Sequence, residues 1–213
     1  MFRDRHDAGR QLAHALIRYK GAKDTIVVAL PRGGVVTGYE VSLALRLPLD
    51  VLITRKLGTP WNPELAMGAL AETGYQHLNA DIIQSYEVSQ SRLEEEVRRQ
   101  QQEINRRIER YRGGRPLPSL KDQTVLLVDD GIATGATFYA SLGALRTAHV
   151  ARIVAAVPVA PPEAASRLKS LVDEVVILQT PALFFAIGQF YQEFAQVEDD
   201  EVIACLEKVR ADI

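Results

Sequence analysis

The chain contains a single cysteine, Cys205, which excludes an intramolecular disulfide. Its 25 basic and 27 acidic residues nearly balance, and a net charge of −2 gives no reason to expect nucleic acid as a partner. No apolar run approaches the roughly 18 residues of a membrane-spanning helix. The N-terminus, Met-Phe-Arg-Asp-Arg-His, lacks the apolar centre of a signal peptide. These absences favour a cytoplasmic protein without membrane or nucleic-acid partners.

Metal chemistry through histidine or cysteine is also not indicated. The four histidines show no metal-ligand spacing with each other or with Cys205. Cys205 itself lies among apolar residues at helical spacing, which is typical of a buried side chain and not of a nucleophile.

The remaining composition describes a globular domain. Hydrophobic residues make up 47% of the 213 and charged residues 24%. That length suits one α/β domain with an embellishment. Buried strands are predicted at residues 25–30, 49–54, 124–128, 153–157 and 175–178. Helices are predicted at residues 4–19, 35–45, 136–146, 162–171 and 201–209. Strands that alternate with helices predict an open, mainly parallel, twisted sheet flanked by helices.

One region interrupts this alternation. About sixty residues, 57–118, separate the second and third strands, far more than an ordinary connection. A long charged helix at residues 88–111 ends this segment, with a narrow apolar stripe along it. Three acid–base pairs spaced i to i+4 predict ion pairs on its surface: Glu94/Arg98, Glu95/Arg99 and Glu103/Arg107. We interpret the charge run as a solvated helix face.

The most informative segment runs from Val125 to Thr137, with the sequence Val-Leu-Leu-Val-Asp-Asp-Gly-Ile-Ala-Thr-Gly-Ala-Thr. A buried strand would deliver Asp129 and Asp130 at its carboxyl end, where open α/β sheets bind ligands. The small residues behind them allow backbone N–H groups to approach a phosphate, and the threonines add hydroxyl donors. Gly135 is followed by Ala136 and not by lysine, so the loop is not a Walker A motif.

Two further cationic segments follow other strands. Arg32, Gly33 and Gly34 come after the first strand and before a helix, where a glycine turn with a guanidinium suits a diphosphate. Arg55 and Lys56 come after the second strand, ahead of a turn-rich stretch that suits a lid. Taken alone, each segment also fits a plain turn or solvated surface charge. The value of the first segment lies in its pairing with residues 129–137, because both loops would open on the same edge of one sheet. Arg55 and Lys56 strengthen that pairing.

The hydrophobic strand, acidic pair and Thr-Gly-Ala-Thr loop together resemble the substrate-binding motif of the type I phosphoribosyltransferases. The resemblance covers about residues 25–56 and 124–157. It implies that Ala133, Thr134, Gly135, Ala136 and Thr137 bind the 5′-phosphate of 5-phosphoribosyl 1-pyrophosphate (PRPP). It also implies that Asp129 and Asp130 contact the ribose hydroxyls and that Arg32, Gly33 and Gly34 bind the pyrophosphate. Arg55 and Lys56 resemble the start of the family's mobile catalytic loop.

The activity that this resemblance implies is transfer of the 5-phosphoribosyl group to a nitrogen acceptor, with a nucleobase and nucleotide salvage as the first candidates, and release of pyrophosphate. The expected cofactor is Mg²⁺, carried by PRPP and held in part by Asp129 and Asp130. Catalytic roles are expected for Asp129, Asp130, Arg55 and Lys56. A homodimer is common in the family.

The resemblance also implies a core at about residues 20–56 and 119–180 within a single domain, 1–213. A small hood subdomain at residues 57–118 would face the acceptor, with a contribution from residues 181–213. The aromatic cluster in residues 184–194 fits either a wall for a flat base or packing at the sheet edge, with packing favoured. Trp61 fits either a ligand stack or an anchor for the lid.

Two alternatives to the enzyme remain open. A regulatory protein of the same fold would sense PRPP or a nucleotide without turning it over, and an interaction protein with a degenerate site would not bind PRPP at all. Arg55, Lys56 and the lid favour the enzyme, as does the short segment before the first strand. The acceptor is not indicated by any residue pattern.

Overall fold

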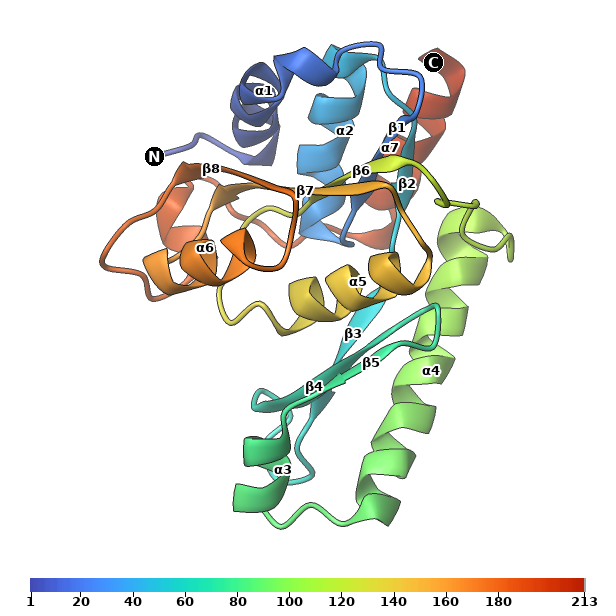
Figure 1. Cartoon of the computed structure of the whole chain (residues 1–213), viewed down its shortest axis with the longest axis vertical. Helices are drawn as coiled ribbons and strands as arrows, with labels where there is room; N and C mark the ends of the chain where they lie inside the picture. The colour runs from blue at the N-terminus through green and yellow to red at the C-terminus, as the bar shows by residue number, and fades with distance from the viewer. Residues whose placement is uncertain (213) are drawn as a thin grey trace.

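The computed structural model describes residues 1–212 and has a central five-stranded parallel sheet in the order β2-β1-β6-β7-β8 (Figure 1). Its strands are β1 (Thr25–Ala29), β2 (Leu49–Val51), β6 (Thr124–Val128), β7 (Arg152–Val159) and β8 (Glu174–Gln179). The predicted mainly parallel sheet with flanking helices is confirmed. Strands β1, β6 and β7 are almost entirely buried, because helices cover both faces of the sheet.

Two helical layers sandwich this sheet (Figure 1). One face is covered by α1 (Arg5–Ala15), α2 (Gly33–Leu45) and α7 (Asp199–Asp212), and the other by α5 (Ala136–Thr147) and α6 (Pro162–Lys169). Alternate residues of β1 divide between the two resulting cores: Val27 and Ala29 face the first, Ile26 and Val28 the second. A single 3-10 turn, Ile17–Tyr19, follows α1, so the first predicted helix is shorter than its apolar pattern indicated.

The segment between β2 and β6 forms a second unit, called the insert below (residues 54–112). It contains an antiparallel sheet of β3 (Thr54–Gly58), β4 (Ala66–Ala71) and β5 (Gln76–Leu78), followed by α3 (Ala80–Ser85) and α4 (Gln90–Arg112). The sheet packs on α5, and α4 runs along its other side (Figure 1). The sequence predicted only the long helix of this unit.

The prediction of one strand at residues 49–54 was wrong. Strand β2 ends at Val51, and Thr54 already begins β3 of the other sheet. Between them, the Leu52 amide donates to Ala29 O at 3.1 Å, whereas the Ile53 amide donates to Glu72 Oε1 at 2.8 Å. The chain therefore passes from one sheet to the next without leaving the interior. An unbroken run of apolar residues predicts that the segment is buried, but it does not predict which sheet the segment joins.

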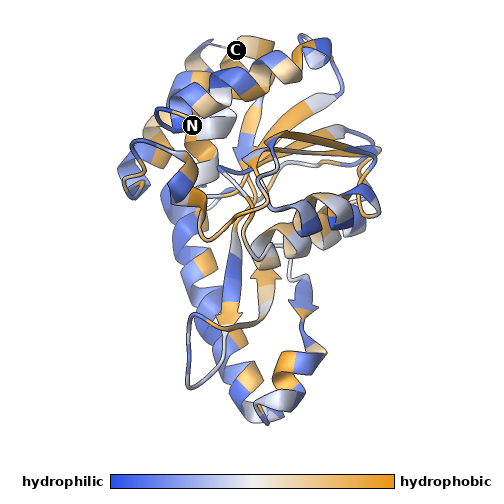
Figure 2. Cartoon of the chain, turned by 90° about the vertical axis from the view of Figure 1, so that its left-hand side faces the viewer, coloured by the Kyte–Doolittle hydropathy of each residue, from blue (hydrophilic) through white to orange (hydrophobic). Residues whose placement is uncertain are grey.

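The apolar stripe of α4 is confirmed, but most of its predicted ion pairs are not. Leu93, Ile104 and Tyr111 are buried in the core, and the outward side of the helix is hydrophilic (Figure 2). Only Glu103/Arg107 forms among the three predicted i to i+4 pairs. Arg92, Arg99 and Arg106 instead pair with glutamates three residues earlier or later. Both spacings bring side chains together on a helix, so spacing alone does not choose between them.

The C-terminal segment before α7 has little regular structure. Phe2 forms a bridge with Tyr191, and both pack with partly buried Phe184 and Phe190 in a third small core cluster. This contact favours the predicted packing role for much of the aromatic cluster, although Phe185 is 86% exposed. Trp61 is 67% exposed in the loop between β3 and β4, so it is not a buried anchor. Within residues 1–212, no helix has the length and apolar character needed to cross a membrane.

Candidate functional site

The acidic pair lies at the carboxyl end of β6, as predicted. Asp129 directly follows the strand, and its carboxylate accepts a hydrogen bond from the Asp130 amide at 2.9 Å. Asp130 is buried, and its backbone oxygen accepts a hydrogen bond from the Tyr191 hydroxyl at 2.6 Å. The turn after β6 is therefore held from both sides, which fixes the direction of the two carboxylates.

The Gly/Thr loop that follows is open to solvent at the start of α5. Ala133 and Thr134 are exposed, and α5 begins at Ala136, so the helix N-terminus points at the loop. Gly135 has a φ of +76°, and a Cβ there would lie 2.6 Å from the Tyr139 ring. Only glycine therefore fits this position. The arrangement leaves backbone N–H groups accessible to an anion.

The glycine loop after β1 lies directly against the acidic pair. Strands β1 and β6 are neighbours in the sheet, so their carboxyl ends share one edge. A Cβ added to Gly33 would lie 2.0 Å from Asp130 Oδ2, and one added to Gly34 would lie 2.8 Å from Asp129 Oδ1. The prediction that the two loops open side by side is confirmed, and the absence of side chains at both glycines makes the approach possible.

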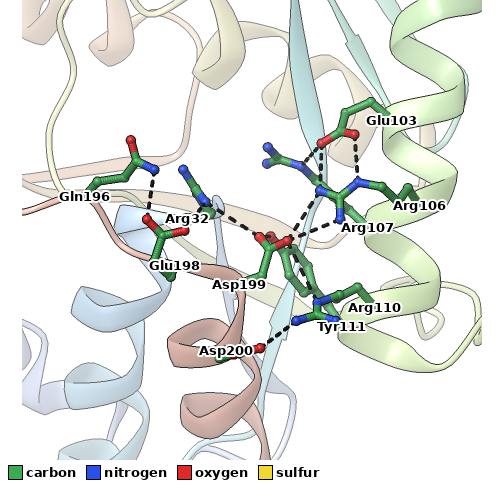
Figure 3. A network of polar contacts seen from close by, with 10 residues as sticks. All are labelled: Arg32, Glu103, Arg106, Arg107, Arg110, Tyr111, Gln196, Glu198, Asp199 and Asp200. Carbon is green, nitrogen blue, oxygen red and sulfur yellow. Dashed lines mark hydrogen bonds and ion pairs between the residues drawn. The ribbon is translucent and has the colours of Figure 1, made fainter.

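The Arg32 side chain points toward the start of α7. Its Nη1 atom lies 3.2 Å from Glu198 Oε2 and 3.8 Å from Asp199 Oδ1 (Figure 3). Asp199 also accepts from the Tyr111 hydroxyl at 2.6 Å and pairs with Arg106 at 3.3 Å. A cluster of C-terminal acids thus orients the arginine of the glycine loop, and no feature of the sequence near Arg32 indicated this contact.

Arg55 and Lys56 belong to β3 of the insert and not to a loop. They line a cavity of about 440 Å³ together with Pro31, which precedes Arg32, and Thr137 from the first turn of α5. The Arg55 Nε atom donates to Gln100 Oε1 of α4 at 2.9 Å, and Lys56 is exposed. The cavity therefore joins Arg55 and Lys56 to Thr137 and to Pro31. The other predicted site residues do not line it: Arg32, Gly33, Gly34, Asp129 and Asp130.

Arg5 is a residue of this site that the sequence did not reveal. It is the first residue of α1, its side chain is 11% exposed, and its Nε atom donates to Asp130 Oδ2 at 2.7 Å. Its Nη1 atom donates to Ala195 O at 2.7 Å, and the guanidinium lies 3.8 Å above the centre of the Phe194 ring. The C-terminal segment and the N-terminal helix thus meet at the acidic pair.

The environment makes the acidic pair electrostatically unusual. Burial, and then the neighbouring Asp130 charge, hold the pKa of Asp129 well above its ordinary value. Burial also raises the pKa of Asp130, and Arg5 opposes that rise. Arg5 is the one arginine beside these two adjacent carboxylates in the described residues, and it does not use all of their oxygen lone pairs. The remaining lone pairs can accept hydrogen bonds from hydroxyl groups or bind a cation. By contrast, burial raises the pKa of the Cys205 thiol to about 11, which makes a nucleophilic role unfavourable.

A parallel sheet with a Gly/Thr loop at a helix N-terminus, and a second glycine loop against an acidic pair, defines an α/β protein whose candidate ligand site lies at the carboxyl edge of the sheet. The family model of the phosphoribosyl transferase domain matches residues 3–191, and the chain belongs to this family.

Individual relatives agree with that assignment. A curated Mycobacterium tuberculosis protein from strain H37Rv, provisionally named a phosphoribosyl transferase, is 46% identical over 212 residues. The match covers 100% of this chain but 48% of the relative, and a protein from strain CDC 1551 gives the same values. The chain thus spans about half the length of these curated relatives. The crystal structure of TT1426 from Thermus thermophilus is 45% identical, with a TM-score of 0.81, and the alignment covers 97% of this chain and 98% of that one.

Proposed function

We propose that this protein transfers the 5-phosphoribosyl group of PRPP to a nitrogen acceptor and releases pyrophosphate. The observation that carries the proposal is the close approach of Gly33 and Gly34 to the acidic pair, which directly precedes the Gly/Thr loop. Under this proposal, the loop that would bind the 5′-phosphate, the carboxylates that would contact the ribose hydroxyls and the loop that would bind the diphosphate belong to one edge of the sheet. A nucleobase acceptor would make the product a nucleotide, as in nucleotide salvage.

The expected roles follow from the positions. Residues 133–137 would bind the 5′-phosphate through backbone N–H groups, and Gly33 and Gly34 would admit the diphosphate. Asp129 and Asp130 would accept hydrogen bonds from the ribose hydroxyls and stabilise positive charge that develops on the ring, as carboxylates do in glycoside chemistry. Arg32, Arg55 and Lys56 would stabilise the departing pyrophosphate.

The residues fit a magnesium ion that arrives with the substrate. Mg²⁺ takes one or two protein carboxylates and completes its shell with water and phosphate oxygens. Asp129 and Asp130 supply two carboxylates, and within residues 1–212 no group of three or more acidic, histidine or cysteine side chains forms a dedicated metal site. When bound, the ion would neutralise charge on the diphosphate.

The test is pyrophosphate release from PRPP and Mg²⁺ with a panel of purine, pyrimidine and amine acceptors. The double variant Asp129→Asn/Asp130→Asn should keep its fold and lose turnover by about 100-fold or more, the scale expected for loss of preorganised charge in an active site. Undiminished turnover in that variant would remove the proposed role of the acidic pair. A cytoplasmic location and a homodimer remain predictions.

One observation favours the regulatory alternative. The carboxylate of Asp130 is already paired with Arg5, so one of the two ribose contacts is satisfied by the protein itself. A PRPP or nucleotide sensor would bind PRPP in calorimetry but release no pyrophosphate with any acceptor. A protein with a degenerate site would bind no PRPP in the same titration.

A further inference from the structure

The helix α4 forms one wall of the cavity that holds Arg55 and Lys56. Gln100, Arg99 and Arg107 of α4 line it opposite Pro31 and Thr137 of the core. Arg107 is 9% exposed, and its Nε atom donates to Glu103 Oε1 at 2.8 Å, one turn earlier on the helix. Arg107 is therefore a buried cation in the wall of a polar cavity. The same cavity borders Pro31, which precedes the glycine loop, and Thr137 of the Gly/Thr loop.

The charges around this cavity do not balance. Its lining contains four cations, Arg55, Lys56, Arg99 and Arg107, against two carboxylates, Glu64 and Glu96. Among residues 1–212, Arg55 has neutral Gln100 as its hydrogen-bond partner and no carboxylate within ion-pair distance. Glu103, the partner of Arg107, is shared with Arg106. The cavity is therefore positive in the absence of a ligand.

Two of these guanidinium groups oppose each other's charge. Burial first, and then the charge of nearby Arg107, lower the pKa of Arg55, and the nearby carboxylates of Glu103 and Glu96 offset only part of this effect. Like charges held together in a half-buried space raise the free energy of the empty site. An anion between them would remove that cost, so the pair favours binding of an anion over remaining empty.

We propose that Arg55 and Arg107 together bind the diphosphate group of PRPP and of free pyrophosphate, with α4 as a wall of the active site. This inference rests on the proposed function and adds Arg107 to it. Guanidinium groups bind phosphate oxygens through paired hydrogen bonds, which suits a diphosphate with its several non-bridging oxygens. The residues that line the cavity include no aromatic side chain, so the cavity does not resemble a pocket for a neutral base.

The position of α4 is coupled to the diphosphate loop. Asp199 of α7 pairs with Arg106 of α4 and also lies 3.8 Å from Arg32 (Figure 3). The Tyr111 hydroxyl donates to the same aspartate at 2.6 Å. Asp199, at the start of α7, therefore fixes the position of the helix that carries Arg107 relative to the loop that carries Arg32.

The experiment is calorimetric titration of the full chain with Mg²⁺-pyrophosphate and, separately, with ribose 5-phosphate. Arg107→Met should weaken pyrophosphate binding by about tenfold or more, the scale of one lost charge-assisted contact, and leave ribose 5-phosphate binding unchanged. Arg107→Lys should give an intermediate value, because it keeps the charge but not the paired donors. The matched control is Arg98→Met, which removes an exposed arginine of the same helix outside the cavity and should change neither affinity.

Each outcome decides the inference. Equal pyrophosphate affinity in Arg107→Met and the unaltered chain would overturn it, as would absence of pyrophosphate binding in the unaltered chain. Loss of affinity for both ligands in an Arg107→Met protein with a lowered melting temperature would show only a structural role for Arg107. Arg55→Gln then decides the inference, because within residues 1–212 Arg55 forms no ion pair whose loss would destabilise the fold. Turnover of PRPP is measured independently of these titrations. Turnover with unchanged pyrophosphate affinity in Arg107→Met would overturn this inference alone, whereas loss of affinity without any turnover would overturn the proposed function alone.

Discussion

Arg5 Nε donates a hydrogen bond to Asp130 Oδ2 at 2.7 Å and joins the first turn of the chain to an aspartate 125 positions later. Both side chains are 11% exposed. The contact closes one end of the candidate site and ties α1 to the turn after β6. It also means that the N-terminal segment, outside the predicted core, is part of the site.

Replacing Arg5 with methionine should destabilise the protein. The substitution leaves the Asp130 carboxylate buried without its partner, and breaking a buried pair in this way costs about 3–5 kcal/mol. Urea unfolding at neutral pH measures the loss. Arg3→Met is the control, because the Arg3 side chain is 68% exposed in a surface pair and its removal should cost less than about 1 kcal/mol. Equal stability of the two variants would contradict the account.

Replacing Gly33 with alanine should damage the site directly. The new methyl group would lie 2.0 Å from Asp130 Oδ2 and 2.9 Å from Arg5 Nε, so the loop or the ion pair must move. We expect a stability loss of about 1–3 kcal/mol, typical of overpacking, together with loss of PRPP binding. Thermal shift with and without PRPP measures both quantities. Gly21→Ala is the comparison: it strains a left-handed backbone in open space, so it should cost stability but keep PRPP binding.

Replacing Arg112 with methionine should loosen the junction of the insert with the central sheet. The Arg112 side chain is 2% exposed and pairs with Glu72, and its Nη1 atom lies 3.8 Å from Asp50 Oδ1 of β2. Burial raises the pKa of both acids, so neither tolerates loss of the cation. We expect a loss of about 3–5 kcal/mol in urea unfolding. Arg110→Met, which removes a 47% exposed side chain two residues earlier, should cost less than about 1 kcal/mol, and a reversed order would refute the assignment.

The contact of Glu103 with two arginines should make stability depend on acid pH. Hydrogen bonds from Arg106 first, and from Arg107, hold the pKa of Glu103 at about 2, below the ordinary 4.5. Because the folded pKa is the lower one, the contribution is complete above pH 4.5 and is lost as the pH falls toward 2. The glutamate is partly exposed, so solvent screening limits the effect to less than about 1 kcal/mol. Urea midpoints of the unaltered chain and Glu103→Gln should differ at about pH 6 and converge at lower pH; a constant difference would rule out the mechanism.

The sequence predicts those parts of the site whose residues form a local pattern, and it does not predict side-chain contacts between residues far apart in the chain. Val125 to Thr137 contains most of a strand, an acidic pair and a Gly/Thr loop in one continuous stretch, and the structure places β6 at the predicted residues 124–128. The side-by-side placement of Gly33 and Asp130 was also predictable, because parallel strands end at the same edge of a sheet. Arg5, Asp199 and Arg107 were not, because no local pattern marks which surface arginine or aspartate reaches a partner far away in the chain.

The insert shows the same limit. The helical period predicts the apolar stripe of α4 but not the strands β3, β4 and β5. The apolar run at residues 49–54 predicts one strand, whereas the structure divides these residues between two sheets. Apolar residues require burial without specifying the partner that buries them.

The sequence by itself determined the α/β class, the strand–helix alternation that favours a parallel sheet, and the positions of the acidic pair and of the two glycine-bearing loops, because each is visible as a pattern within short stretches of the chain. Only the tertiary structure decided that Arg5 pairs with Asp130, that Asp199 links Arg32 to α4 and that Arg107 and Arg55 line one cavity. These contacts join segments brought together by burial of the core, and the free energy of that burial is a property of the whole fold.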